Sequence, residues 1–357
     1  MSSNKTKTNR PVPVNPATSP TATDVTQRAS QANLQQLGLF APKPPPEDLP
    51  TDRLVAPPLP TDIHLGTSSW NFEGWKGLVY PAGHRSKKDF MKTSLGAYAR
   101  HPLFTTVGID ASYYNPLTRS QLAHYGEQLP ESFRALEKVW DAITTSHWPH
   151  HPRYGARGGK PNPHYLDAGL FQEAVLQPNL EVFAEHLGPL LFEFPPLPPQ
   201  HLPTSRAFCQ DLDRFFSQLP RGPLYAVELR NRSLFTPRYL RTLRDHNVCH
   251  CVNLWTHMPT VKAQQAAGDI FTGPALVMRL MLAPGHRYSE RVQAWSPFRR
   301  LHTVEAEHRK AAVDLVWEAH ARAVNSYLIV NNKFEGCSPL SVHALAEAIS
   351  RRITESS

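Results

Sequence analysis

The sequence predicts an α/β protein, a single (β/α)₈ TIM-like barrel of residues 61–355 that follows a disordered, proline-rich N-terminal tail of residues 1–60. Eight short apolar segments recur from Ile63 onward, and amphipathic segments separate most of them. The repeating part has about the length that is typical of such barrels, ~250 residues. Hydrophobic residues make up 40% of the 357 residues, which is enough for a large core.

The first sixty residues differ in composition from the rest of the chain. They hold twelve of the 35 prolines and many Ser, Thr, Asn and Gln residues. Such a segment buries too little apolar surface to offset the entropy of ordering it, so we expect a flexible tail. Apolar spacing within Asp24–Phe40 also fits a short helix that docks on the barrel or on a partner, although disorder is favoured. No apolar run follows the basic residues of the N-terminus, which argues against a secretory signal.

Strands are expected where apolar residues follow one another almost without interruption. This pattern is typical of parallel strands that are covered on both faces. In chain order, the candidates are Ile63–Ser69, Phe104–Asp110, Phe133–Trp140, Pro189–Phe194, Leu224–Leu229, Val248–Asn253, Ala275–Leu282 and Ser326–Asn331.

Helices are expected where apolar residues recur at helical spacing. Ser205–Leu219 is the clearest case, because Phe208, Leu212, Phe215 and Phe216 share one face. The other candidates are Asp89–Arg100, Thr118–Gln128, Leu180–Leu187, Thr236–His246, a weak segment at Thr260–Ala267, His302–Val324 and Leu340–Ile353.

An open, doubly wound sheet is the alternative fold. It requires a glycine-rich turn after the first strand. Here that strand leads into Thr67, Ser69 and Trp70 instead, so the closed barrel is favoured.

One long segment, Asp141–Asp167, has no clear periodicity. Segments of this kind inside a compact domain are usually functional or disordered. It follows the third strand and therefore leaves the barrel at the end that carries active sites. His147, His150 and His151 lie in it, but their spacing matches no zinc-binding motif, so we predict no metal site.

Charged residues in buried strands mark the candidate site. An isolated charge in a core is costly unless it is paired or reaches water. Because these residues come from different strands, closure of the barrel would bring them together at the strand ends. The catalytic candidates are Glu228, Glu193, Lys138 and Asp110, with the two glutamates as an acid–base pair tuned by Lys138 and Arg230.

Further polar and aromatic residues near the strand ends are candidates for substrate binding. They are Ser68, Trp70, Tyr114, Arg230, Asn253, Arg279, Asn331 and Asn332. Mixed charges with aromatic walls suit a small polar or anionic ligand. A purely structural ion-pair network is the alternative, but the number of converging groups favours a site. A serine nucleophile at Ser68 or Ser69 has less support, because no G-x-S-x-G turn is present.

The remaining composition bears on partners and location. A formal net charge of +8 fits a nucleic-acid partner, but the basic residues are scattered, so this partner is not favoured. The four cysteines form no C-x-x-C pair, which fits a reducing, cytoplasmic location. No run of eighteen apolar residues predicts a membrane span. The sequence specifies neither a cofactor nor an oligomeric state.

Several motifs together resemble a known family. They are Gly66–Trp70 followed by Trp75 and Tyr80-Pro81, Thr106–Asp110 with Tyr113-Tyr114, Leu187–Pro196, Ala226–Ser233, and Asn331-Asn332. From Ile63 to Leu345 the chain resembles the YecE-like domain-of-unknown-function family, number seventy-two. The resemblance implies a TIM-like barrel and supplies no reaction.

The sequence departs from that family's pattern at four positions. Gly108 stands where the family usually has Glu, Asp110 where it has Asn, Glu193 where it has Gln, and Leu234 where it has Trp. A carboxylate at Asp110 or Glu193 is therefore the candidate to replace the acid missing at Gly108. The alternative is a member of the family that binds a ligand without catalysing a reaction.

Three functions follow as hypotheses. The first is an enzyme, hydrolase- or isomerase-like, that acts on a small polar or anionic, sugar- or phosphate-bearing substrate at the C-terminal face of the barrel. The alternatives are a nucleic-acid-associated protein and a non-catalytic scaffold whose tail binds a partner.

Overall fold

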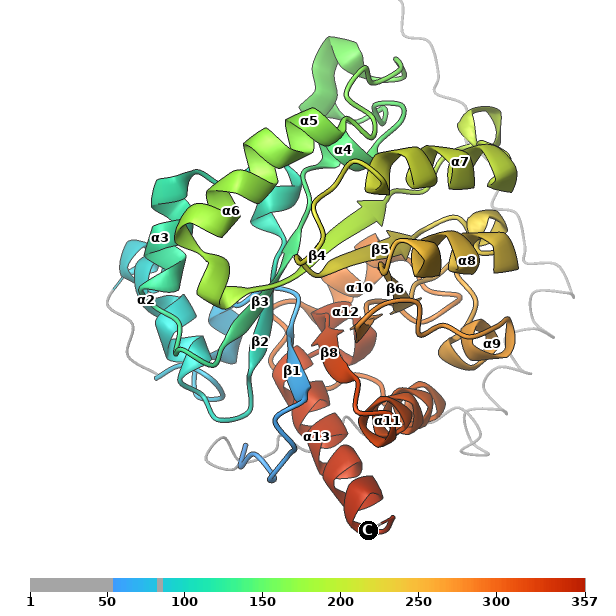
Figure 1. Cartoon of the computed structure of the whole chain (residues 1–357). Helices are drawn as coiled ribbons and strands as arrows, with labels where there is room; N and C mark the ends of the chain where they lie inside the picture. Colours follow the sequence, from blue (N-terminus) through green and yellow to red (C-terminus); the bar gives the residue numbers. More distant parts are fainter. Residues whose placement is uncertain (1–53, 82–85, 357) are drawn as a thin grey trace, which may run out of the picture. The chain divides into compact units, whose positions relative to one another are not determined.

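A computed structural model describes residues 54–81 and 86–356 of the chain (Figure 1). The tail predicted for residues 1–60, with its helical segment Asp24–Phe40, therefore lies outside the described residues except for its last seven. Those seven residues contain no helix or strand, and Leu54, Ala56 and Leu59 pack against the hydrophobic core of the barrel. The boundary at residue 60 stays a prediction.

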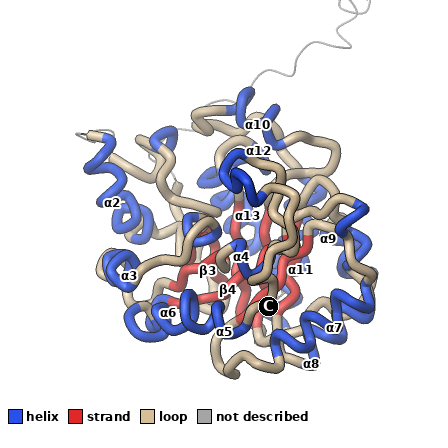
Figure 2. Tube along the Cα trace, turned by 90° about the horizontal axis from the view of Figure 1, so that it is seen from above, coloured by secondary structure: helices blue, strands red, loops and turns tan. Residues whose placement is uncertain are grey.

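Parallel strands close into a barrel in which each strand pairs with its neighbours in sequence and β8 pairs with β1. The strands are β1 Ile63–Thr67, β2 Thr106–Ile109, β3 Arg134–Lys138, β4 Leu187–Phe194, β5 Tyr225–Leu229, β6 Cys249–Leu254, β7 Ala275–Leu280 and β8 Asn325–Val330. Seen from above, the strands lie inside and the helices surround them (Figure 2). The predicted fold class is confirmed, and each predicted strand overlaps an observed one.

Helices follow most of the strands, as predicted. The longer ones are α2 Lys87–Ala99, α3 Arg119–Gly126, α7 Ser205–Phe216, α8 Pro237–Asp245, α9 Val261–Ala266, α10 Tyr288–Trp295, α11 Ala306–Ala321 and α13 Ser338–Thr354. α11 and α13 run side by side near the C-terminus (Figure 1). The weak candidate after the sixth strand is confirmed as α9, whereas α10 was not predicted.

The helix predicted at Leu180–Leu187 is confirmed only in part, because it overlaps α6 and the 3₁₀ turn Ala184–His186 but has the wrong bounds. The helical segment begins earlier, as α5 Ala168–Phe171, a π-helical turn at Gln172–Leu176, and α6 Gln177–Val182, and Leu187 already belongs to β4. The buried face of this segment is made by Phe171, Val175 and Leu176, while Leu180 is 47% exposed. The predicted helix therefore starts too late, and of its apolar residues Leu180 is exposed while Phe183 is buried.

Threonine side chains fix where several outer helices begin. Thr118, Thr204, Thr236 and Thr260 are the N-cap residues of α3, α7, α8 and α9. Each hydroxyl accepts a hydrogen bond from the backbone N–H three residues later, which satisfies a donor that the first helical turn leaves free. The helix starts are therefore encoded locally.

Alternation along the strands places polar groups on top of an apolar barrel interior. Leu136, Leu191, Ala226, Cys251 and Val277 lie in the cluster that fills the interior. Successive side chains of a strand point to opposite faces, so the residue two positions later points inward as well. Those residues are Lys138, Glu193, Glu228, Asn253 and Arg279, all at or next to the C-terminal ends of their strands.

The segment Asp141–Asp167 is held to the barrel although it is mostly irregular. It contains α4 Asp141–Thr144 and a 3₁₀ segment at Pro152–Arg157. The Asn162 side-chain amide donates hydrogen bonds to the carbonyl oxygens of Ala142 and Thr145, both at 2.7 Å. The segment is therefore fixed at its two ends against the exit of β3.

All four cysteines are free and buried. Cys249 and Cys251 lie inside the barrel, two residues apart on β6, as the predicted strand required. Within the described residues, no helix combines the length and the hydrophobicity that a membrane span requires.

Candidate functional site

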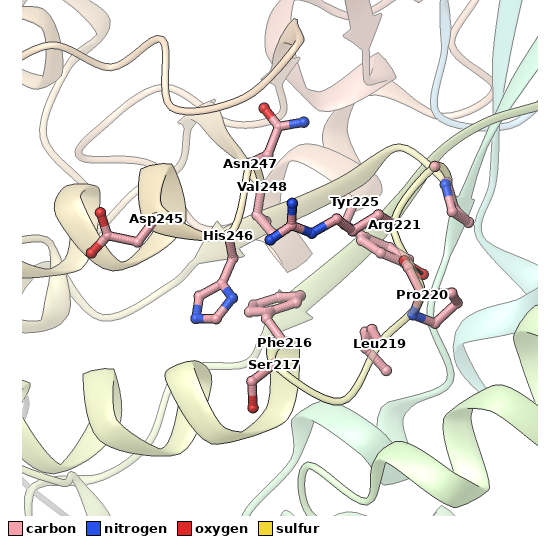
Figure 3. Close-up of a pocket in the computed structure, with 12 residues that line it drawn as sticks. Phe216, Ser217, Leu219, Pro220, Arg221, Tyr225, Asp245, His246, Asn247 and Val248 are labelled. Carbon is pink, nitrogen blue, oxygen red and sulfur yellow. Dashed lines mark hydrogen bonds between the residues drawn. The ribbon is translucent and has the colours of Figure 1, made fainter.

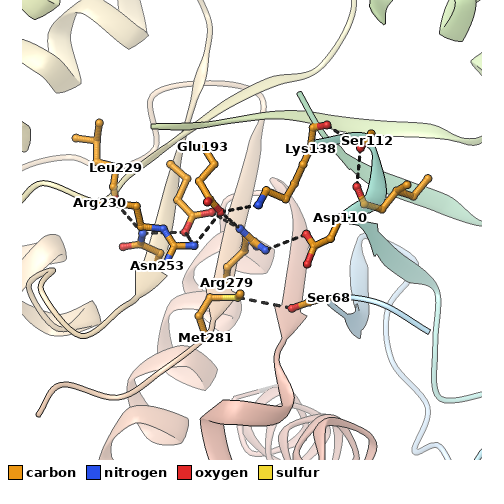
Figure 4. Close-up of polar contacts among 12 residues, drawn as sticks. Ser68, Asp110, Ser112, Lys138, Glu193, Leu229, Arg230, Asn253, Arg279 and Met281 are labelled. Carbon is orange, nitrogen blue, oxygen red and sulfur yellow. Dashed lines mark hydrogen bonds and ion pairs between the residues drawn. The ribbon is translucent and has the colours of Figure 1, made fainter. Parts of the chain in front are cut away.

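Glu193 is the centre of a group of charges at the C-terminal end of the barrel (Figure 4). Its Oε2 atom lies 3.0 Å from Lys138 Nζ, 2.9 Å from Arg230 Nη2 and 2.9 Å from Arg279 Nη1. Lys138 belongs to β3, Arg230 follows β5, and Arg279 belongs to β7. Only closure of the barrel therefore brings these cations to one carboxylate. Burial would raise the pKa of Glu193, but Arg230, Lys138 and Arg279 together hold it well below its usual range.

Glu228 lies beside Glu193 in the β4–β5 pair and has no exposed surface. Its Oε1 atom lies 2.7 Å from Arg230 Nη2 and accepts a hydrogen bond from Asn253 Nδ2 at 3.0 Å, and its Oε2 atom accepts one from Arg279 Nη1. Both oxygens are therefore occupied by donors of the protein. This carboxylate holds the two arginines in place.

Asp110 is the carboxylate of the group that solvent reaches most readily. It follows β2 directly, its side chain is 36% exposed, and its Oδ1 atom lies 3.4 Å from Arg279 Nη2. We call Asp110, Lys138, Glu193, Glu228, Arg230 and Arg279 the charged network. Its three cations and three carboxylates carry no net charge when all are ionised.

Aromatic rings lie under two of the cations. Lys138 Nζ is 3.9 Å from the ring centre of Tyr113, and the guanidinium carbon of Arg230 is 3.9 Å from the ring centre of Trp255. Such stacking holds a cation in place and is stronger where water is excluded. Neither ring is among the predicted site residues, because the prediction named Tyr114 rather than its neighbour Tyr113 and did not include Trp255, one residue after β6.

Four predicted site residues do not join the charged network. The ring of Trp70 is buried in the outer core and packs edge-on against Tyr125 at 5.4 Å. Ser68 contacts Met281 instead. The Asn331 side chain accepts a hydrogen bond from the backbone N–H of Lys333 and so caps the start of α12, Asn332–Glu335. Asn332 Oδ1 accepts from the backbone N–H and the hydroxyl of Ser338. A binding role for these residues stays a prediction.

Tyr114 lies at the edge of the network, next to the irregular segment. The guanidinium carbon of Arg153 lies 3.4 Å from its ring centre. Both residues line a cavity of about 430 Å³ together with Trp148, Tyr154 and Arg157. The segment Asp141–Asp167 thus forms one wall of the barrel mouth.

A second cavity, of about 460 Å³, lies at the other end of the barrel (Figure 3). Arg221, Tyr225, His246 and Asn247 line it, at the start of β5 and just before β6. His246 Nε2 is held 2.8 Å from Asp213 Oδ1. Residues at this end of such barrels serve stability rather than catalysis, so the charged network remains the candidate site.

The charged network can bind and orient hydroxyl groups and can accept a proton. Glu193 stays ionised at neutral pH because three cations surround it, and Asp110 faces the solvent. Burial opposes the charge of Arg279, but Glu228, Asp110 and Glu193 raise its pKa well above the ordinary value. Within the described part of the chain, no group of three or more His, Cys, Asp or Glu side chains is arranged to hold a metal ion.

The family model "Protein of unknown function DUF72" matches residues 64–356. The chain belongs to the DUF72 family. The resemblance of the sequence motifs to the YecE-like family is thereby confirmed. No curated protein matches the sequence significantly.

Solved structures of DUF72 proteins share the fold. A DUF72 family protein from Thermotoga maritima is 20% identical, with 82% of this chain and 99% of that chain covered and a TM-score of 0.53. One from Enterococcus faecalis is 18% identical, with 81% and 95% covered and a TM-score of 0.53. At this identity the likeness bears on the barrel architecture alone.

Proposed function

We propose that this DUF72 protein is an enzyme that acts on a small polar, hydroxyl-bearing substrate at the C-terminal end of the barrel. The observation that carries the proposal is the convergence of Lys138, Arg230 and Arg279 on one ionised carboxylate, Glu193, beside the accessible Asp110. Active sites of such barrels lie at this end. Charges that are already oriented need no reorganisation when charge develops in a transition state.

Proton transfer is the chemistry that these groups support. Asp110 is the proposed proton acceptor, because it is the most exposed carboxylate of the network. The Lys138 ammonium, 3.0 Å from Glu193 and stacked on Tyr113, is placed to stabilise an oxygen that gains negative charge. Glu228 is buried with both oxygens engaged, so we assign it a positioning role. This chemistry fits a hydrolase- or isomerase-like reaction.

The proposal is tested with a panel of sugars, sugar acids and sugar phosphates, followed by NMR for hydrolysis or isomerisation. Asp110→Asn and Lys138→Met are expected to lower kcat by about a hundredfold or more, as removal of a proton-transferring or charge-stabilising group does. Lys310→Met is the control, because Lys310 is exposed on α11 and pairs with Asp314 on the same helix. It should keep the wild-type rate.

Turnover that survives both substitutions unchanged contradicts the proposal, as does the absence of turnover of every compound by the folded wild-type protein. Two further measurements distinguish the alternative functions, a nucleic-acid-associated protein and a non-catalytic scaffold. Salt-dependent binding of labelled RNA or DNA by the wild-type chain would favour the nucleic-acid partner. Loss of a co-purifying protein on removal of residues 1–53 would favour the scaffold.

A further inference from the structure

The cavity beside the charged network contains two cations, Arg153 and Arg157, that form no close ion pair with any described residue. Arg153 and Arg157 are exposed and lie four residues apart in the segment Pro152–Arg157, on either side of a kink at Gly155. Among the described residues, no carboxylate lies within ion-pair distance of either guanidinium. Asp141 also lines this cavity and lies within electrostatic reach of both arginines, and it accepts a hydrogen bond from the Tyr154 hydroxyl at 2.7 Å.

Aromatic rings hold both guanidinium groups in place. The guanidinium carbon of Arg153 lies 3.4 Å from the ring centre of Tyr114, and that of Arg157 lies 4.6 Å from the ring centre of Trp148. Trp148 in turn packs on Tyr154 at 5.3 Å. An arginine that is stacked in this way loses less side-chain entropy on binding a ligand, and its N–H groups remain free to bind an oxyanion.

The two neighbouring sites differ in charge. The charged network is balanced, so an anion there must compete with Glu193 for its cations. In the cavity, Arg153 and Arg157 outnumber Asp141, which leaves one net positive charge. The anionic part of a ligand is therefore expected in the cavity, and its uncharged polar part at the network.

Tyr114 joins the two sites. It lies four residues after Asp110, at the end of the short 3₁₀ turn Ala111–Tyr113 that follows β2. It lines the cavity, and its ring lies under the guanidinium group of Arg153. Burial raises the pKa of its hydroxyl, Arg153 lowers it, and Asp110 and Glu193 raise it. The ring therefore lies within electrostatic reach of both sites.

We propose that Arg153 and Arg157 bind the phosphate group of a substrate whose hydroxyl-bearing part reaches the charged network. This inference rests on the proposed function, and it adds the substrate class, a phosphorylated polyhydroxy compound. The planar guanidinium fork matches the oxygens of phosphate, with which it forms paired, charge-assisted hydrogen bonds.

Calorimetric titration with inorganic phosphate tests the assignment. Arg153→Gln and Arg157→Gln are each expected to weaken phosphate binding about tenfold, since a hydrogen bond to a charged group contributes about 1.5 kcal/mol. The control is the double variant Arg206→Gln, Arg241→Gln. It removes two exposed arginines of α7 and α8, so it changes the net charge of the protein twice as much as either test variant does. Its affinity should stay within about twofold of wild type.

Several outcomes overturn the assignment. They are no saturable phosphate binding to the wild-type protein, unchanged affinity in the Arg153 and Arg157 variants, an equal loss in the control, or equally tight binding of acetate in place of phosphate.

If Lys138→Met loses phosphate and the Arg153 variant keeps it, the anion binds at the charged network, and the proposed function stands without this inference. If the Arg153 variant loses phosphate and Asp110→Asn leaves turnover intact, the phosphate site stands and the proposed proton acceptor fails.

Discussion

Glu193 and Glu228 are neighbours across the β4–β5 pair, yet their surroundings assign them different roles. The Glu193 side chain is 13% exposed and binds three cations through one oxygen, whereas the Glu228 side chain is fully buried and uses both oxygens. A buried carboxylate that two arginines share is costly to remove, because each arginine then keeps a charge that is only partly compensated. Both residues are glutamates, and they differ in how far solvent can reach the carboxylate.

Glu228→Gln should therefore destabilise the protein. The glutamine keeps the shape and loses the charge that Arg230 and Arg279 face, so we expect a loss of about 3 kcal/mol in the free energy of unfolding, measured in urea. Glu290→Gln is the control, because Glu290 is an exposed residue paired with Arg287 at 3.7 Å, and it should change less than about 1 kcal/mol. A similar, small change in both variants would show that Glu228 does not hold the arginines.

Glu137 precedes Lys138 on β3 and points away from the barrel interior. It is 1% exposed, and neither carboxylate oxygen has good hydrogen-bonding geometry with another described side chain. Burial raises the pKa of Glu137 from its ordinary value of 4.5 to about 8, and the neighbouring Asn179 offsets only part of that rise. Near neutral pH this carboxyl is therefore mostly protonated in the folded protein.

The raised pKa of Glu137 predicts a dependence of stability on pH. The folded protein binds this proton more tightly than the unfolded chain, so the contribution is complete below about pH 4.5 and is lost as the pH rises toward 8. Glu137→Gln should match wild type near pH 4.5 and exceed it in the free energy of unfolding by a few kcal/mol at pH 8, at about 1.4 kcal/mol per pKa unit. Urea unfolding at both pH values measures the difference.

Glu131→Gln serves as the control for this experiment, since Glu131 is exposed before the same strand. This variant should stay within about 1 kcal/mol of wild type in the free energy of unfolding, as is usual for exposed sites. A Glu137→Gln difference that is equal at pH 4.5 and pH 8 would show that the carboxyl is not protonated in the fold.

At the scale of elements, the end of β1 and β2 approach each other closely at Gly108. A Cβ atom at Gly108 would lie 2.9 Å from the carbonyl oxygen and 3.1 Å from the Cα atom of Ser68, both of them backbone atoms. A side chain there requires the two strands to move apart. The glutamate that the family resemblance leads us to expect at this position would need the same shift, and Asp110, two residues later, is the nearest acid on β2 or its end.

Gly108→Ala should therefore destabilise the fold by about 1–3 kcal/mol, as overpacking of a close contact does. In Gly126→Ala, at the end of α3, the nearest atoms are side-chain carbons of His186 and Phe183 at 3.5 and 3.7 Å. That variant should stay within about 1 kcal/mol of wild type. Thermal unfolding of both variants compares them, and equal stability would mean that β1 and β2 separate without cost.

At the scale of the whole molecule, ring closure creates the site. Residues from β2 through β7 meet at one end of the barrel, on top of an interior that Leu136, Leu191, Ala226 and Val277 fill. The apolar layer excludes water from below, which strengthens the interactions among the charges above it. The irregular segment Asp141–Asp167 then adds an aromatic and cationic wall at one side of the mouth.

How far the sequence predicted the site depends on how local each signal was. Lys138, Glu193, Glu228 and Arg279 could be identified because an ionised residue in an apolar strand needs a partner. Trp70 looked like a pocket wall, but α3 offers it Tyr125 as a packing partner, and nothing nearby in sequence indicates that contact. Arg153 and Trp255 were missed for the same reason, because the rings and cations they contact lie in other loops.

The sequence by itself determined the order and type of most elements, since apolar periodicity and threonine caps act within a few residues. It also determined which strands carry charge. Only the tertiary structure decided which charges meet, which carboxylate is buried and which is open, and that Arg153 and Arg157 share a cavity. Those outcomes depend on strand register and loop packing across the closed barrel, and such contacts join residues far apart in the chain.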